Sequence, residues 1–426
     1  MSSEWRQTTI GEQVTLQRGF DITKADQRFG KIPVVSSAGI SSWHDTSMVK
    51  GPGVVLGRKG VVGSVYYIDQ DFWPHDTSLW VKNFHGNDPR FIYYFFRAFS
   101  KELQALDVGS ANPTLNRNHV HPIEVNWPAK LSEQIEIASF LGAFDDRITL
   151  LRETNATLEA IAQALFKSWF VDFDPVRAKM EGRMPESMDE ATAALFPDGF
   201  EESELGEVPR GWCVDSCANW LEVLETGRRP KGGVSGIKTG VPSIGAESII
   251  RIGEFDFEKT KYVSDDFFKK MNSGLLETND VLLYKDGGKP GVFLPRVSMF
   301  GDGFPFEVCV INEHVFRIRL KKPFGQAFLY FWLWSDAVMH ELKHRGGKAA
   351  IPGINQSDVK ELRIIVPNDF VLMQFEQLTS PLVLSIFKNS KQIQTLSNIR
   401  NTLLPRLISG QLRLTEVESQ LAEALS

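Results

Sequence analysis

The chain has 426 residues, of which 42% are hydrophobic and 23% charged, with 30 Phe and 10 Trp. This length favours two or three domains, and the composition excludes a disordered or collagen-like chain. No apolar run approaches the about 20 residues that a membrane span needs, and the first residues lack an apolar signal region. The three cysteines form no CxxC pair. We therefore expect a cytoplasmic protein with no membrane segment.

The net charge of −6 is unevenly distributed along the chain. Residues 129–204 carry 7 Lys and Arg against 16 Asp and Glu, a net charge of −9, whereas the flanking blocks are near neutral. Any site for a polyanion must therefore be a local basic patch, and the acidic segment is expected to face protein partners or solvent.

An internal duplication organises the sequence. Residues 111–128 align without gaps on residues 350–367, at an offset of 239, and Asn116 matches Asn355. Apolar residues alternate with polar ones near the end of the first copy, which predicts a half-buried strand there. These alternating residues are Ile123, Val125 and Trp127.

Each copy is followed by apolar residues three and four positions apart, which is typical of a coiled-coil seam. The predicted seam residues are Leu141, Phe144, Ile148, Leu151, Leu158 and Leu165, then Leu382, Ile386, Ile393, Leu396, Leu403 and Leu407. Asn155 interrupts the first seam, and Pro381 is expected to begin the second helix at its N1 position. Each helix could pack on its own domain, but two equivalent seams more naturally pair with each other.

The sequence therefore predicts an α+β fold of two similar domains that alternate with two long helices, as a pseudo-twofold internal repeat. The expected boundaries are a first domain at 1–130, a helix at 131–173, a linker at 174–204, a second domain at 205–368, a helix at 369–412 and a tail at 413–426.

Motifs for catalysis are weak. His340-Glu-Leu-Lys-His344 matches the HExxH zinc motif, but no histidine follows it as a third ligand. We therefore expect no metal and a solvated basic helix end. His119 and His121 lie two residues apart and are expected on one side of a strand, as a surface pair. No Walker A sequence or cofactor-binding glycine loop is present, so the chain is expected to be non-catalytic.

Several segments carry a family resemblance. The run from Leu158 to Pro175 resembles the first conserved region of type I restriction-modification specificity subunits, and Leu403–Leu412 is similar to the close of their second. Glu204–Trp212 resembles the start of their second target-recognition domain, and Gly57-Arg-Lys-Gly60 is similar to segments found across these domains. The resemblance covers nearly the whole chain and agrees with the duplication.

The resemblance implies that each target-recognition domain reads one half of a split, asymmetric DNA site. The two helices would run antiparallel, hold the domains apart and dock modification subunits. The implied partners are double-stranded DNA, two methyltransferase subunits and restriction subunits. This chain would hold no cofactor, with S-adenosylmethionine, ATP and Mg on the partner subunits. A specificity subunit of a related, type IIB-like restriction system and a stand-alone metal-dependent enzyme that uses HExxH are the alternatives.

Candidate DNA-contacting residues are Arg, Lys, Asn and Gln on turns, because these side chains supply the usual base and phosphate contacts. In the first domain they are Arg58, Lys59, Asn116, Arg117 and Asn118. In the second domain they are Arg228, Arg229, Lys285, Lys289, Lys343, Arg345, Lys348, Asn355 and Gln356. The alternative for each residue is an ordinary solvated position on a turn.

Overall fold

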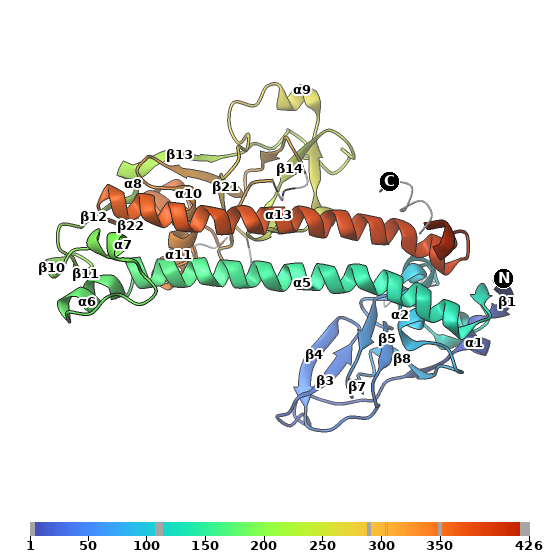
Figure 1. Cartoon of the computed structure of the whole chain (residues 1–426). Helices are drawn as coiled ribbons and strands as arrows, with labels where there is room; N and C mark the ends of the chain where they lie inside the picture. Colours follow the sequence, from blue (N-terminus) through green and yellow to red (C-terminus); the bar gives the residue numbers. More distant parts are fainter. Residues whose placement is uncertain are drawn as a thin grey trace. The chain divides into compact units, whose positions relative to one another are not determined.

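The computed structural model (Figure 1) describes residues 5–106, 114–287, 291–302, 304, 306–347 and 352–417. The chain divides into two compact units. The first unit consists of Met1–Arg147 and Leu396–Ser426, and the second consists of Ile148–Thr395. Each unit contains one α+β domain together with a part of each of the two long helices.

The first unit contains a four-stranded sheet, a three-stranded sheet and a strand pair. The four-stranded sheet has the order β2 (Thr15–Arg18), β8 (Ser78–Asn83), β5 (Gly53–Gly57), β6 (Val65–Ile68). The three-stranded sheet has the order β4 (Gly39–His44), β3 (Ile32–Ser36), β7 (Trp73–Pro74). The antiparallel pair joins β1 (Trp5–Thr9) to β9 (Glu124–Pro128).

The second unit repeats this topology. Its four-stranded sheet has the order β13 (Leu221–Thr226), β21 (Val315–Leu320), β18 (Val281–Tyr284), β19 (Val297–Met299). Its three-stranded sheet has the order β17 (Lys261–Val263), β14 (Val241–Ile244), β20 (Val310–Ile311). The matching pair joins β12 (Cys213–Ser216) to β22 (Arg363–Val366).

The short helices also recur in the same chain order. In the first unit they are α1 (Ile10–Gln13), α2 (Pro89–Ala98), α3 (Ser100–Ala105) and α4 (Arg117–Val120). In the second unit they are α8 (Cys217–Trp220), α10 (Gln326–Leu333), α11 (Asp336–Gly346) and α12 (Gln356–Lys360). The α+β class is confirmed, and the duplication read from 18 aligned residues extends to both domains. Val125 and Trp127 of β9 are buried, as their alternation predicts.

The second domain contains elements that have no counterpart among the described residues of the first. A small hairpin of β15 (Ile249–Arg251) and β16 (Glu254–Phe255) lies between β14 and β17, with the short helices η1 (Ala246–Ser248) and η2 (Phe257–Lys259) on either side. In the first domain β4 follows β3 after a two-residue turn. The helix α9 (Asp265–Phe268) follows β17.

Each domain has its own apolar core. In the first unit the N-cap Asp88 accepts a hydrogen bond from the Phe91 backbone N–H at 2.8 Å, which starts α2 ahead of Pro89. The helix then buries Phe91, Phe95 and Phe96 against the four-stranded sheet. In the second unit α10 is buried over almost its whole length in a separate core.

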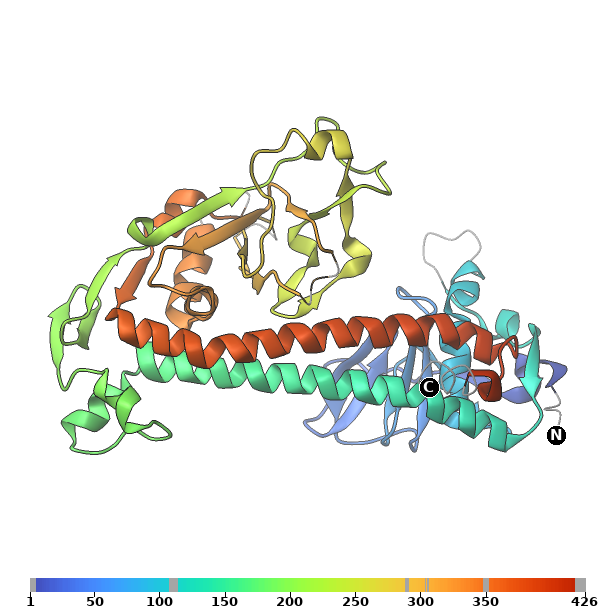
Figure 2. The same ribbon diagram turned by 45° about the horizontal axis from the view of Figure 1, so that its top comes forward.

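The two long helices, α5 (Leu131–Phe170) and α13 (Asp369–Ile408), have 40 residues each. Within each unit their segments lie side by side and run antiparallel (Figures 1 and 2). In the second unit Asn389 Nδ2 donates to Asn155 Oδ1 at 2.9 Å, while Phe166 contacts Phe375. All twelve predicted seam residues are buried or half-buried. The two long helices therefore contact each other in the second unit, and their seam residues also pack in the domain cores. The pairing of the two seams along their whole length stays a prediction.

The prediction that Pro381 begins the second helix is wrong, because α13 starts at Asp369 and continues through the proline. A proline inside a helix costs about 3 kcal/mol. The turns before it bury Val371, Leu372 and Phe375 almost completely. Burial of such side chains contributes about 1.5–3 kcal/mol each, which outweighs the cost of the proline.

The segment expected as a linker, 174–204, is folded. It contains α6 (Asp174–Met180), α7 (Glu190–Ala194) and β10 (Phe200–Ser203), which pairs with β11 (Gly206–Pro209). Val176 and Phe196 are buried in the core of the second unit. Their apolar side chains outweigh the polar composition that suggested a linker.

By length and composition, α13 is long and apolar enough to span a membrane, with a mean hydropathy of 1.3 over 18 residues. It is the one described helix with this property. The buried residues of α13 belong to the two cores, which accounts for its apolar character without a membrane.

Candidate nucleic-acid interface

In the first domain, the structure brings together two segments that the sequence separates by more than 50 residues. Arg58 and Lys59 follow β5, and their backbone N–H groups both donate to the Thr77 carbonyl at 3.0 Å. The Leu115 N–H donates to the Arg58 carbonyl at 2.9 Å, which places Asn116 next to this turn. Three of the predicted contact residues, Arg58, Lys59 and Asn116, therefore cluster around the end of β5.

The charged side chains of this turn are partly neutralised. Arg18 forms an ion pair with Asp76 at 2.8 Å, and Arg58 Nη1 donates to the Asp76 carbonyl at 3.2 Å. Burial alone would raise the pKa of Asp76, but the hydrogen bond from Arg18 and the neighbouring His75 hold it below its usual value. Partial burial lowers the pKa of Arg58. Lys59 is exposed, so the turn presents cationic groups to solvent.

The residues of α4 have structural contacts. Asn116 is the N-cap and accepts a hydrogen bond from the Asn118 N–H at 3.0 Å. Arg117 Nη1 donates to the Leu16 carbonyl at 3.3 Å, which ties the helix to β2.

The strand predicted for His119 and His121 is wrong, because Asn116 starts a helix there. His119 lies in α4, and His121 follows it as the C-cap. His121 Nε2 accepts the Leu16 N–H at 3.0 Å, and burial lowers its pKa. It therefore has a structural contact of its own and is not one of a surface pair.

The second domain has the corresponding arrangement. The Lys285 N–H, after β18, donates to the His314 carbonyl at 2.9 Å, and the Ile354 N–H donates to the Lys285 carbonyl at 2.7 Å. Asp286 accepts from Lys285 Nζ at 2.8 Å and also pairs with His314 Nδ1. Burial would raise the pKa of Asp286, but these two partners lower it.

Arg228 and Arg229 lie on the exposed loop after β13. Arg229 forms a long ion pair with Glu313 at 3.5 Å. Both arginines line a cavity of about 40 Å³ together with Lys261 and His314. Because a water molecule occupies about 30 Å³, this cavity is too small for a base. Both arginine side chains are exposed at the surface.

Asn355 and Gln356 match their first-domain counterparts. Asn355 caps α12 by accepting hydrogen bonds from the N–H groups of Ser357 and Asp358. Gln356 Nε2 donates to the Leu224 carbonyl at 3.2 Å, which ties α12 to β13.

The basic C-terminal end of α11 offers less exposed positive charge than its composition suggests. Arg345 is paired with Glu341 at 2.6 Å, with Glu361 at 2.7 Å and, more loosely, with Asp358. Lys343 is exposed on the same helix. Lys289 and Lys348 lie outside the described residues. The Glu341 of the HExxH motif is thus held by an arginine, and the described residues contain no group of three His, Cys, Asp or Glu that could hold a metal.

Sequence reasoning missed the turns at 75–77 and 312–314, which contribute Asp76, Glu313 and His314. Nothing in their local sequence indicates a contact with Arg58 or Lys285, because the contact depends on strand pairing between distant segments. A signal could have come from aligning the strands of the two copies beyond residues 111–128.

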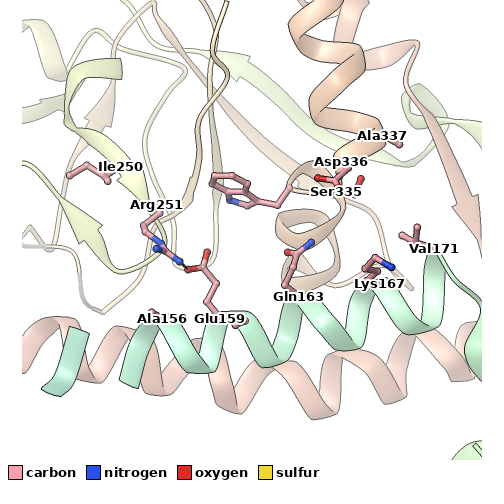
Figure 3. A pocket seen from close by; sticks show the side chains of 12 residues that line it. Ala156, Glu159, Gln163, Lys167, Val171, Ile250, Arg251, Ser335, Asp336 and Ala337 are labelled. Carbon is pink, nitrogen blue, oxygen red and sulfur yellow. Dashed lines mark hydrogen bonds and ion pairs between the residues drawn. The ribbon is translucent and has the colours of Figure 1, made fainter. Parts of the chain in front are cut away.

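A larger cavity of about 550 Å³ lies on α5 in the second unit (Figure 3). On its wall Glu159 pairs with Arg251 and accepts the Tyr330 hydroxyl at 2.6 Å. Complete burial beside this carboxylate raises the pKa of Tyr330 well above its usual value. Lys167 is paired with Asp172. These contacts join α5 to the β15–β16 hairpin and to α10, so they position the domain on the helix.

The tip of the hairpin reaches the polar position of the helix pair. Gly253, at φ +74°, lies against Ile386 and Ser390. Its carbonyl accepts the Ser390 hydroxyl at 2.7 Å, and Ser390 in turn lies 3.3 Å from Asn155 Nδ2. The polar interruption of the seam therefore supports the second domain as well as the pairing of the helices.

Comparison with known proteins agrees with this architecture. Residues 2–160 match a family model described as a type I restriction modification DNA specificity domain. The chain is 26% identical over 329 residues to the type I restriction enzyme MjaIX specificity subunit of Methanocaldococcus jannaschii, covering 77% of this chain and 70% of that protein. It is also 26% identical over 354 residues to the HindI specificity subunit of Haemophilus influenzae, covering 70% of this chain and 71% of that protein.

The fold is similar to the crystal structure of a type I restriction-modification S subunit from M. genitalium, with a TM-score of 0.54 and 16% identity. The similarity covers 95% of this chain and 96% of that one. Both curated relatives are named type I restriction enzyme specificity subunits. The family resemblance seen in the sequence is thereby confirmed, and the chain is a homologue of type I restriction-modification specificity subunits.

Proposed function

We propose that this chain is the DNA sequence-specificity subunit of a type I restriction-modification complex, and that each recognition domain binds one half of a bipartite, asymmetric site. One observation carries the proposal. The same turn, built on the same backbone hydrogen bonds, occurs once in each domain and presents different side chains. Two similar frameworks with dissimilar contact groups suit a site with two dissimilar halves.

The proposal assigns the outer faces of α5 and α13 to partner proteins. Large apolar side chains remain exposed along both helices, and such side chains favour packing against another protein. They include Leu150 and Ile161 on α5, and Phe370, Met373 and Leu384 on α13. We assign these faces to two methyltransferase subunits, with restriction subunits completing a cytoplasmic complex. S-adenosylmethionine, ATP and Mg would be bound by those partners.

The helix pair would also act as a spacer. The seam from Ile137 to Trp169 corresponds to roughly 50 Å of helix, which equals about a helical turn of DNA or somewhat more. Four residues inserted into each helix, after Arg147 and after Thr395, would lengthen the pair by about 6 Å. The unread spacer should then grow by one or two base pairs while both half-sites keep their sequence. A changed half-site sequence would contradict the spacer role.

The direct test is a methylome. The chain would be expressed with its modification subunit in a methylation-free host, and methylated adenines would be mapped by single-molecule sequencing. The expected result is one split, asymmetric motif that disappears when this chain is omitted. Methylation at an unsplit motif, or a folded complex that methylates nothing, would refute the proposal.

A further inference from the structure

Backbone hydrogen bonds establish which residues of the two domains are equivalent. The Arg58 N–H donates to the Thr77 carbonyl, and the Lys285 N–H donates to the His314 carbonyl. Downstream, Lys59 forms an isolated bridge with Thr114, and Asp286 forms one with Gly353. Residues 58, 59 and 77 of the first domain therefore correspond to residues 285, 286 and 314 of the second.

The same comparison identifies contacts that are retained although the residue changes. Arg117 donates to the Leu16 carbonyl of β2, and Gln356 donates to the Leu224 carbonyl of β13. The acidic residue of each turn also pairs with an arginine, but from different positions: Arg18 of β2 pairs with Asp76, and Arg229 on the loop after β13 pairs with Glu313. The N-caps are asparagine in both domains. We call a contact part of the framework when both domains keep it although the side chain that makes it differs.

At three pairs of equivalent positions the backbone arrangement is the same in the two domains, but the side chains differ in their chemistry. Arg58 corresponds to Lys285, Lys59 to Asp286 and Thr77 to His314. All six side chains are exposed or half-buried, and each set of three lies around one turn. The first domain has two cations and the Thr77 hydroxyl, which also accepts the Ser37 N–H at 3.3 Å. The second presents a lysine, a carboxylate and an imidazole linked through Asp286.

We propose that these three positions, 58/285, 59/286 and 77/314, determine the base sequence of the two half-sites, an inference that rests on the proposed function. The chemistry of each set differs in what it can recognise. Arginine and lysine donate to guanine O6 and N7, whereas an aspartate accepts from the cytosine amino group. A backbone held by its own hydrogen bonds allows these side chains to change without loss of the fold.

The test transfers the second set into the first domain. The full chain carrying Arg58→Lys, Lys59→Asp and Thr77→His would be expressed with its modification subunit, and its methylome compared with that of the unchanged chain. We expect the preference at one or more bases of the first half-site to change by about five- to a hundredfold. The second half-site and the spacer should stay unchanged.

Lys82→Gln is the matched control for the loss of a positive charge, because Lys82 is an exposed lysine of the first domain on β8, outside the three positions. It should leave both half-sites as they are. If the triple variant methylates the original motif at the original level, or if Lys82→Gln is the variant that alters the motif, the assignment is wrong.

Single variants guard against misfolding. Lys59→Gln and His314→Thr change one solvent-accessible side chain each, and their thermal unfolding can be compared with that of the unchanged chain. If the triple variant does not fold, an unaltered motif in both of these folded variants overturns the assignment. Absence of any split motif with the unchanged chain would instead refute the proposed function itself.

Discussion

The contact of Gly253 with the helix pair gives the sharpest prediction about stability. A Cβ at this residue would lie 2.6 Å from both Ile386 Cγ2 and Ser390 Oγ, in a backbone conformation with φ +74°. Gly253→Ala therefore incurs about 1–2 kcal/mol for the left-handed conformation and about 1–3 kcal/mol for overpacking. We expect a loss of about 2–5 kcal/mol in the free energy of unfolding, measured by urea denaturation of the full chain.

Gly211 supplies the control. Its φ is +79°, and a Cβ there would meet nothing within 4 Å. Gly211→Ala should therefore cost only the conformational part, about 1–2 kcal/mol. For a unit of this size, each 1 kcal/mol lowers the melting temperature by about 2–4 °C. Equal losses in the two variants would refute the argument that the hairpin tip packs tightly on the helices.

Three further outcomes are expected. Of the three cysteines only Cys213 is exposed, and burial raises the pKa of the Cys217 and Cys309 thiols to about 12. A thiol reagent at pH 8 should therefore modify one cysteine in the native chain and three after denaturation. Burial raises the pKa of Glu376 in the folded chain above its value in the unfolded chain. The protonated carboxyl group therefore stabilises the fold at low pH, and this stabilisation is lost as the pH rises through the folded-state pKa. Glu376→Gln should therefore raise the melting temperature at pH 8 and change it little at pH 4, and equal shifts would contradict this. Phe375→Ala should cost about 3–5 kcal/mol by leaving a cavity, whereas Phe370→Ala, at a side chain 68% exposed, should cost far less.

Local sequence patterns predicted a large part of this architecture. Alternation at residues 123–127 gave the strand β9, and the three–four spacing gave both seams, because each pattern reflects burial along one element. The duplication predicted that Asn116 and Asn355 would occupy equivalent places, and both cap a helix. Patterns of this kind are set by neighbours in the sequence and therefore remain readable in it.

Features that depend on tertiary contacts could not be read in the same way. Pro381 favours a helix start by its local chemistry, but the buried turns before it extend the helix. His119 and His121 fit a strand by spacing, but the Asn116 cap starts a helix there. The pairing of Asp286 with His314 joins two strands through a turn, and neither segment indicates the other.

The two domains repeat a backbone, but the side chains that hold them on α5 do not repeat. In the first unit Asp145 accepts the Tyr94 hydroxyl at 2.7 Å and Arg97 at 3.1 Å, and it also pairs with Arg400. In the second unit Glu159 accepts Tyr330 and pairs with Arg251, which lies on a hairpin that the first domain lacks.

Each domain therefore has its own carboxylate, half-buried at Asp145 and buried at Glu159, and its own ionic partner. Removing one partner from such a buried pair costs several kcal/mol, whereas replacing the whole set together can be nearly neutral. Changes at these anchors are therefore expected to occur together, as a set. The half-buried turns at 58 and 285 are less constrained, because their backbone hydrogen bonds to residues 77 and 314 use no side-chain atom, even though Asp286 also pairs with Lys285 and His314. After the duplication, substitutions are therefore expected to cost the least stability at the positions that we assign to DNA reading.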